Sequence, residues 1–291
     1  MASGCVFEKV IIIGYGQIVN QCILKLNELK TVYGYSLTYV EYEKTELSTS
    51  VDLCEKEGID YTEISDKSAL TSYFLEKTEK TLIISAGNFY IFPESVVEKE
   101  NFTIINFHSA LLPKYPGRNA QSWAIFMEEK EAGATWHFVT KELDAGKYII
   151  QKPCEITEDT KAYELTGQIM NEAYEGFAEI IDGVLTDRYE KVQDKPVDKN
   201  RRVYKGKDVP GNGVFNIEDG AEYIYRLLRS TDYGKSDIFP PICTILNGNK
   251  VRISNYKRIP NEGISEITVD ERTIYIPFDE NSTLRLRYKS L

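Results

Sequence analysis

The run Val10-Ile11-Ile12-Ile13, followed at once by Gly14-Tyr15-Gly16, restricts the fold of this chain more than any other segment. Four consecutive β-branched residues have no polar face, which predicts a parallel strand buried on both sides. The next apolar residues recur every three or four positions, as in a helix packed on a sheet: Ile18, Cys22, Leu26 and Leu29. This segment is therefore the strand, turn and helix of an α/β fold.

Strands are also predicted at 37–40, 81–85, 103–108 and 134–139, and a helix over 163–181. Strands that alternate with helical segments indicate an open, mostly parallel sheet covered by helices. The Gly14-x-Gly16 turn resembles a dinucleotide-binding fingerprint, but Val19 occupies the position of its third glycine. A tight strand-to-helix turn is the better interpretation.

The C-terminal part has a different pattern. Residues 187–210 are polar and contain Pro196 and Pro210, as expected of a connector. Beyond them we expect a helix over 217–230 with Asn216 as its N-cap, and then a β-rich module with a type I′ hairpin at Asn247-Gly248. Its strands are predicted at 242–246, 251–253, 266–269, 272–278 and 283–288. The predicted domains are residues 1–190 and the smaller residues 191–291.

The charge and cysteine content favour some environments over others. The formal net charge of −10 and a pI near 5.0 work against extensive binding to nucleic acid. The basic cluster at 199–207 is either a phosphate contact or a solvated linker. Five widely spaced cysteines without a C-x-x-C pair predict no disulfide framework and no metal site. Without a leader pattern or a long apolar stretch, we expect a cytoplasmic protein that does not bind membranes.

Histidine is scarce, since only His108 and His137 occur in 291 residues. His108 ends the predicted strand 103–108, where open parallel sheets bind ligands, and its ring titrates near neutrality. Asn106 points to the same side of that strand, and Asp144 follows the next one. An amide, an imidazole and a carboxylate together can hold charge on a carbonyl oxygen and move a proton. Taken singly, each has a purely structural explanation: Asn106 as the cap of a turn, His108 as a hydrogen-bonded buried histidine and Asp144 as the first residue of a turn.

Residues 106–117, Asn-Phe-His-Ser-Ala-Leu-Leu-Pro-Lys-Tyr-Pro-Gly, resemble the N-x-H-x-S-L-L-P signature of formyltransferases that use 10-formyltetrahydrofolate. Residues 133–139, 143–146 and 149–151 are similar to the second block of that family, and residues 88–93 to the loop that holds the pterin. The chain departs from the family where serine, threonine and aspartate are common, at Ala110, Ala145 and Lys147.

The resemblance implies a formyltransferase-type fold, with a Rossmann-like N-terminal domain and a smaller β-rich C-terminal domain. It implies that an amine attacks the formyl carbon, that Asn106 and His108 hold the oxyanion, and that Asp144 assists proton removal without any metal. The role of His137 stays open, because it either approaches the site or packs within its strand. The folate, which is the formyl donor, is expected to contact six residues: Phe89, Tyr90, Ile91, Leu111, Val139 and Lys141.

The C-terminal module, through residues 223–229 and the Asn247-Gly248 hairpin, resembles the extension of sugar-nucleotide N-formyltransferases and, more distantly, of methionyl-tRNA formyltransferases. The purine-pathway enzyme has no such extension. With the acidic charge, we expect a primary amine on an amino-sugar nucleotide or a similar small molecule, and methionyl-tRNA formyltransferase is the chief alternative. Alternatives of other classes are a formyltetrahydrofolate hydrolase and a non-catalytic folate-binding module. The possible assemblies include a homodimer.

Overall fold

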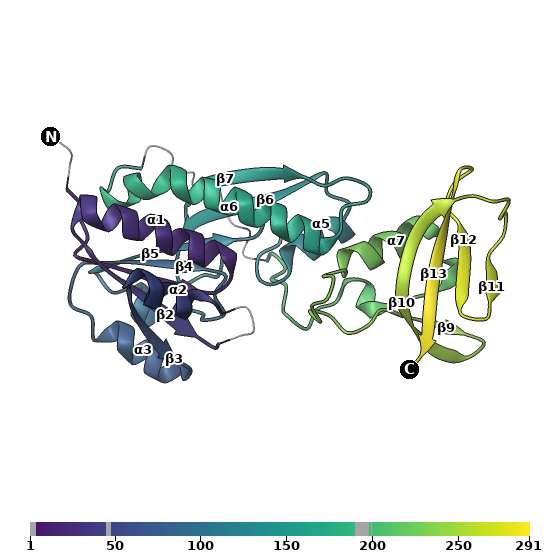
Figure 1. Cartoon of the computed structure of the whole chain (residues 1–291), viewed down its shortest axis with the longest axis horizontal. Coiled ribbons are helices and arrows are strands. Elements are labelled where there is room, and N and C mark those ends of the chain that lie inside the picture. Colours follow the sequence, from purple (N-terminus) through teal and green to yellow (C-terminus); the bar gives the residue numbers. More distant parts are fainter. Residues whose placement is uncertain (1–3, 45–47, 190–197, 199) are drawn as a thin grey trace. The chain divides into compact units, whose positions relative to one another are not determined.

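The computed structural model describes residues 4–44, 48–189, 198 and 200–291. The chain forms two compact units (Figure 1). The first comprises Met1–Gly117, Ala132–Cys154 and Gly167–Val203, and the second comprises Arg118–Glu131, Glu155–Thr166 and Tyr204–Leu291. The predicted boundary at 190/191 lies outside the described residues and stays a prediction.

The first unit is built on a seven-stranded sheet in the order β3-β2-β1-β4-β5-β6-β7. Strands β3, β2, β1, β4 and β5 pair in parallel, and β6 runs antiparallel to β5. This confirms the predicted open, mostly parallel sheet. The strands are β1 (Lys9–Gly14), β2 (Ser36–Tyr42), β3 (Asp60–Ile64), β4 (Thr81–Ala86), β5 (Phe102–His108), β6 (Glu131–Phe138) and β7 (Tyr148–Glu155).

The predicted first strand and helix are confirmed as β1 and α1 (Gln17–Tyr33), and the four apolar positions predicted on the helix are all buried. Gly14 has φ 138°, and a Cβ atom there would overlap the carbonyl oxygen of Ala86 on the neighbouring β4. Only glycine tolerates both conditions. The requirement comes from the packing of β1 against β4, which supports the tight-turn interpretation.

Helices α2 (Ser50–Glu57), α3 (Lys67–Leu75), α4 (Glu94–Val97) and α5 (Ala120–Phe126) lie in connections between these strands, and β7 is followed by α6 (Ala162–Leu185). The last confirms and lengthens the helix predicted over 163–181. In Figure 1, α1 and α6 run side by side, and Tyr33 Oη donates a hydrogen bond of 2.6 Å to Asp182 Oδ1 between them. Within the described part of the chain, every helix is too short or too polar to cross a membrane.

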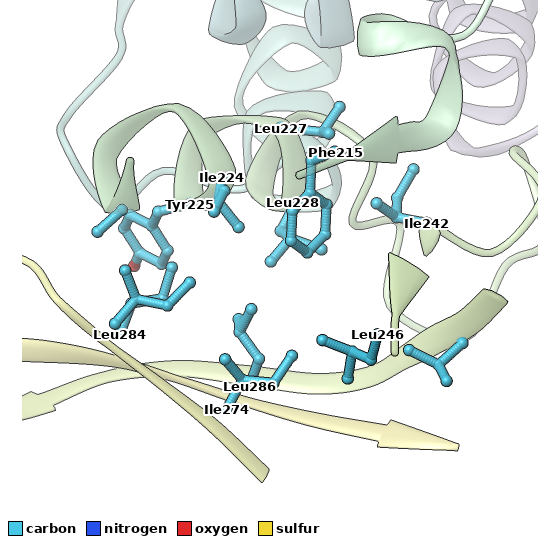
Figure 2. Close-up of a cluster of buried hydrophobic side chains, with 13 residues drawn as sticks. Phe215, Ile224, Tyr225, Leu227, Leu228, Ile242, Leu246, Ile274, Leu284 and Leu286 are labelled. Atoms are coloured by element: carbon cyan, nitrogen blue, oxygen red, sulfur yellow. The ribbon is translucent and has the colours of Figure 1, made fainter. Parts of the chain in front are cut away.

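The second unit contains a six-stranded sheet in the order β11-β12-β13-β10-β9-β8. Its core forms where the apolar face of α7 (Ala221–Ser230) packs on this sheet, with Ile224 and Leu228 facing Leu286 (Figure 2). The strands are β8 (Val214–Phe215), β9 (Cys243–Leu246), β10 (Asn249–Pro260), β11 (Thr268–Asp270), β12 (Thr273–Pro277) and β13 (Ser282–Ser290), and a short 3-10 turn at Pro210–Gly213 precedes them.

Two local predictions in this unit have different outcomes. Asn247 and Gly248 have φ values of 48° and 79°, so the type I′ hairpin is confirmed. The helix predicted over 217–230 is wrong in its first turn. Gly220, with φ 90°, separates a 3-10 turn, Ile217–Asp219, from α7. Asn216 therefore caps the 3-10 turn rather than the α-helix.

Candidate functional site

The strand register explains why the predicted polar residues meet. Strands β5 and β6 are antiparallel, with Asn106 directly opposite His137 and His108 directly opposite Thr135. Side chains directly opposite each other in a sheet share a face and lie close together. The loop after β6 adds Asp144, whose Oδ2 is 3.6 Å from His108 Nδ1 and whose Oδ1 is 3.8 Å from His137 Nε2. The structure thus brings Asn106, His108 and Asp144 together, with His137 beside them.

His137 is a buried, neutral member of this cluster. Its side chain is 3% exposed, and burial lowers the pKa of His137 from 6.5 to about 4, although the Asp144 carboxylate opposes the shift. Nδ1 lies 2.9 Å from the carbonyl oxygen of Phe138, which only accepts, so Nδ1 carries the proton. Nε2 is then an acceptor and faces Asn106 Nδ2 at 3.2 Å.

The Asn106 amide is fixed from both ends. Its Oδ1 accepts a hydrogen bond of 2.7 Å from Ser85 Oγ at the end of β4. Its Nδ2 donates to His137 Nε2 and, at 3.1 Å, to the carbonyl oxygen of Phe107. These contacts determine which end of the amide is the donor. A donor held in one orientation suits the binding of an oxyanion.

His108 and Asp144 are held by backbone groups of the segment after β5. His108 Nε2 donates to the carbonyl oxygen of Tyr115 at 2.9 Å, which directs Nδ1 toward the carboxylate. The Gly117 N–H donates to Asp144 Oδ2 at 2.8 Å. The side chains of both residues are 7% exposed. A proton on His108 Nδ1 would therefore lie beside a buried, hydrogen-bonded carboxylate.

A second network fixes the chain just beyond His108. Thr135 Oγ1 donates to the Ala110 carbonyl oxygen at 2.6 Å and accepts from the Leu112 N–H at 3.2 Å. Gln151 Nε2 donates to Thr135 Oγ1 and to the Leu112 carbonyl oxygen. The position where the family commonly has serine, Ala110, is thus held through its backbone.

The six residues predicted to contact folate lie in several environments. Tyr90 is buried in an apolar core, with its hydroxyl 2.8 Å from Thr71 Oγ1, whereas the adjacent Ile91 is 62% exposed. The Phe89 ring lies 4.9 Å from the Tyr15 ring, so these residues after β4 and β1 meet where the strand order reverses. Ligands of open α/β sheets bind at this reversal.

The other predicted folate contacts come from the segments after β5 and β6. Val139 packs against the core that contains Tyr90, and Lys141 Nζ pairs with Glu94 Oε1 at 3.4 Å. The ion pair joins the loop after β6 to the first residue of α4. Leu111 is half-buried next to Gly133, where a Cβ atom would crowd the leucine side chain. Roles in folate binding stay predictions for all six.

Four residues around the site are missing from the sequence prediction: Ser85, Thr135, Gln151 and Arg201. Ser85 ends a predicted strand, so the strand-end rule that located His108 could have found it. Arg201 has no such signal, because its guanidinium reaches the carbonyl oxygens of Leu143 and Asp144 from a distant segment. This contact gives one residue of the basic cluster at 199–207 a role that was not predicted. Among the described residues, no group of three or more His, Cys, Asp or Glu side chains is arranged to hold a metal ion.

The formyl transferase family model matches residues 9–181, which is more than half of the chain. The chain belongs to the formyl transferase family. Curated relatives of this formyl transferase include a methionyl-tRNA formyltransferase of Clostridium tetani, 31% identical over 42% of this chain and 39% of the relative. A methionyl-tRNA formyltransferase of Thermodesulfovibrio yellowstonii is 26% identical over 68% of this chain and 61% of the relative. The matched segments therefore span less than two thirds of either relative.

Solved structures match nearly the whole chain. WlaRD, a sugar 3N-formyl transferase crystallised in the presence of dTDP and 5-N-formyl-THF, superposes with a TM-score of 0.70 at 18% identity, covering 97% of this chain and 98% of WlaRD. The N-formyltransferase of Helicobacter canadensis, in complex with folinic acid and dTDP-3-aminofucose, gives a TM-score of 0.72 at 16% identity, covering 96% and 99%. At these identities the similarity shows a common fold.

Proposed function

We propose that this formyl transferase moves the formyl group of 10-formyltetrahydrofolate to the primary amine of an amino-sugar nucleotide. The observation that carries the proposal is the buried cluster of Asn106, His108 and Asp144 at the carboxyl end of β5. The ligands named for the two solved relatives, a formyl folate with dTDP or dTDP-3-aminofucose, support the substrate class. The exposed Ile91 and the Tyr15–Phe89 ring pair fit an apolar, planar ligand beside that cluster.

The folate would supply the reactive one-carbon unit, and the protein would supply position and electrostatics. Attack by a neutral amine places negative charge on the formyl oxygen, which needs donors aimed at it. Asn106 already binds Phe107 O through one amide hydrogen, and a charged oxygen is a stronger acceptor than a peptide carbonyl. The formyl oxygen would therefore replace Phe107 O as the acceptor of that hydrogen, and the new hydrogen bond would strengthen as charge develops on the formyl oxygen. One such donor contributes roughly 3 to 4 kcal/mol to the transition state.

The transfer needs an acceptor for the amine proton and a proton for the folate nitrogen that leaves. As the new C–N bond forms, the amine nitrogen loses a proton to the Asp144 carboxylate, directly or through a water molecule. The old bond from the formyl carbon to the folate nitrogen breaks, and that nitrogen gains the proton that Asp144 took from the amine, directly or through a water molecule. His108 Nδ1 faces Asp144, and the Nε2 hydrogen, which binds Tyr115 O in this structure, would be the second donor to the oxyanion. His137 stays neutral at working pH and holds the Asn106 amide through Nε2.

A second acceptor, charged initiator tRNA, is favoured by the basic residues on two strands of the second unit. Strands β10 and β13 lie side by side and carry four and three Lys or Arg residues, respectively, and no Asp or Glu, in a chain of net charge −10. Lys257 is directly opposite Arg285, and Arg252 is directly opposite Lys289. Like charges directly opposite each other destabilise a sheet, and a phosphate backbone would relieve the repulsion. The two curated relatives described above are also methionyl-tRNA formyltransferases.

The experiment is a formyl-transfer screen with 10-formyltetrahydrofolate as donor. Acceptors are a panel of amino-sugar nucleotides and charged initiator tRNA, and His108→Ala is the control for chemistry. Formylation of a sugar nucleotide that disappears in His108→Ala supports the proposal. A double variant, Arg285→Ser with Arg287→Ser, should leave sugar formylation unchanged, because both residues lie in the second unit, outside the cluster.

Other outcomes identify the alternatives. Formylation of tRNA with every sugar nucleotide untouched would overturn the proposal, and its loss in the double variant would assign the basic strands to tRNA. Formate released at the turnover rate without an amine indicates a hydrolase. Folate binding that survives His108→Ala and Asp144→Ala, with no transfer to any acceptor, indicates a binding module.

A further inference from the structure

The backbone at Asp144 is held in an unfavourable conformation. Asp144 has φ 50°, in the left-handed region that residues with a side chain rarely adopt. Two residues later, a Cβ atom at Gly146 would overlap the carbonyl oxygen of Phe138, so the loop passes tightly against the end of β6. Such conformations persist only where surrounding contacts determine them.

One of these contacts comes from the far end of the first unit. The Arg201 guanidinium donates through one nitrogen to the Asp144 carbonyl oxygen, at 3.1 Å, and through the other to the Leu143 carbonyl oxygen. A planar fork with fixed donors suits two successive carbonyls, and a lysine ammonium does not reproduce it. The base of the side chain is also ordered, because the Arg201 N–H donates to the Asp198 carbonyl oxygen at 3.1 Å.

The residue that Arg201 holds at its backbone is also the one whose carboxylate is proposed to take the amine proton. Asp144 Oδ2 is held by the Gly117 N–H, so the residue is fixed by one bond on its side chain and by Arg201 on its backbone. Rotation of the peptide at Asp144 would change the 3.6 Å separation between its carboxylate and His108 Nδ1. A shift of about 1 Å in a reacting group can reduce a rate about 10²-fold.

We propose that Arg201, which lies beyond the family-matched residues 9–181, is a positioning residue that holds Asp144 in its working geometry. This inference rests on the proposed formyl transfer. Arg201 itself touches no reacting atom, and it acts through the backbone carbonyls of Leu143 and Asp144. The simpler role to be excluded is a surface arginine that merely satisfies two carbonyls and stabilises the loop.

The test compares Arg201→Ala and Arg201→Lys with Arg188→Ala, which removes an exposed arginine of the same unit. With a formyl-accepting amine, we expect kcat of Arg201→Ala to fall about 10²-fold, with KM for the folate little changed. The decrease in kcat should be smaller for Arg201→Lys than for Arg201→Ala. Guanidinium chloride at low millimolar concentration should restore part of the kcat of Arg201→Ala and none of that of His108→Ala. A kcat of Arg201→Ala equal to that of Arg188→Ala, or no response to guanidinium, overturns the proposal.

A second readout does not depend on activity. The chain has only two histidines, so both ring signals can be followed in protein labelled with ¹⁵N-histidine. Displaced His108 and His137 signals in Arg201→Ala, but not in Arg188→Ala, support positioning, and unchanged signals overturn it. If Arg201→Ala does not fold, the same comparison is made with Arg201→Lys. If the wild-type protein formylates no amine, the proposed function fails, and the ring signals still decide the role of Arg201.

Discussion

Acidification from pH 7 to pH 5 should weaken the first unit through His137. Burial gives the folded ring a pKa of about 4, against 6.5 for an unburied one, so the unfolded chain binds more protons between these values. The neutral ring contributes stability above pH 6.5, and this contribution is lost as the pH falls toward 4. The complete effect is on the order of 3 kcal/mol, and about 2 kcal/mol of it is lost by pH 5.

The measurement is urea unfolding at pH 7 and pH 5, followed by tryptophan fluorescence in a Trp123→Phe background, so that the signal comes from Trp136, which is fully buried beside His137. The matched variant is His137→Gln, which keeps an acceptor for Asn106 but cannot be protonated. The wild-type protein should lose about 2 kcal/mol more than the variant between the two pH values. Equal losses in both proteins, or a His137 ring signal that titrates near 6.5, would refute the reasoning.

Three further predictions concern packing and chemistry. Gly146→Ala places a methyl group against the Phe138 carbonyl and should lower the free energy of unfolding by about 3 kcal/mol. Its control, Gly167→Ala, places a methyl group in open space on α6 and should raise the free energy of unfolding by up to about 1 kcal/mol. Thermal unfolding of both variants measures these changes. Leu286→Ala removes a fully buried side chain from the second unit and should cost about 2 to 5 kcal/mol in urea unfolding. Asp144→Asn should reduce kcat about 10²- to 10⁴-fold while folate still binds, and a variant with normal kcat would remove Asp144 from the chemistry.

The parts of the fold that sequence predicts well are those in which a few neighbouring residues determine the outcome. The run Val10–Ile13 can only be buried, and Asn247-Gly248 can adopt its turn without help from elsewhere. Strand β3 (Asp60–Ile64) escaped prediction because its residues are exposed or half-buried at a sheet edge. It is a strand because β2 offers it a hydrogen-bonding partner, which is a property of the sheet and not of the segment.

In the candidate site, too, some features could be predicted from the sequence and others could not. His108 and Asp144 could be located because both follow strands, and the carboxyl ends of strands gather at one edge of the sheet. The neutral state of His137 could not be predicted, because it depends on burial beneath other elements. The contact of Arg201 with the Asp144 carbonyl joins residues 57 positions apart, and no local pattern encodes such a contact.

The place of Arg201 also bears on how such proteins diversify. A chimera that receives the C-terminal module of another protein needs a junction that leaves the proposed site intact. A junction at residue 181, where the family match ends, would exchange Arg201 together with the module and leave the Leu143 and Asp144 carbonyls without these donors. A junction after Val203, where the first unit ends, would keep it. Chimeras joined on either side of Arg201 would therefore show whether an exchanged module changes the acceptor alone or also removes a contact that the proposed chemistry needs.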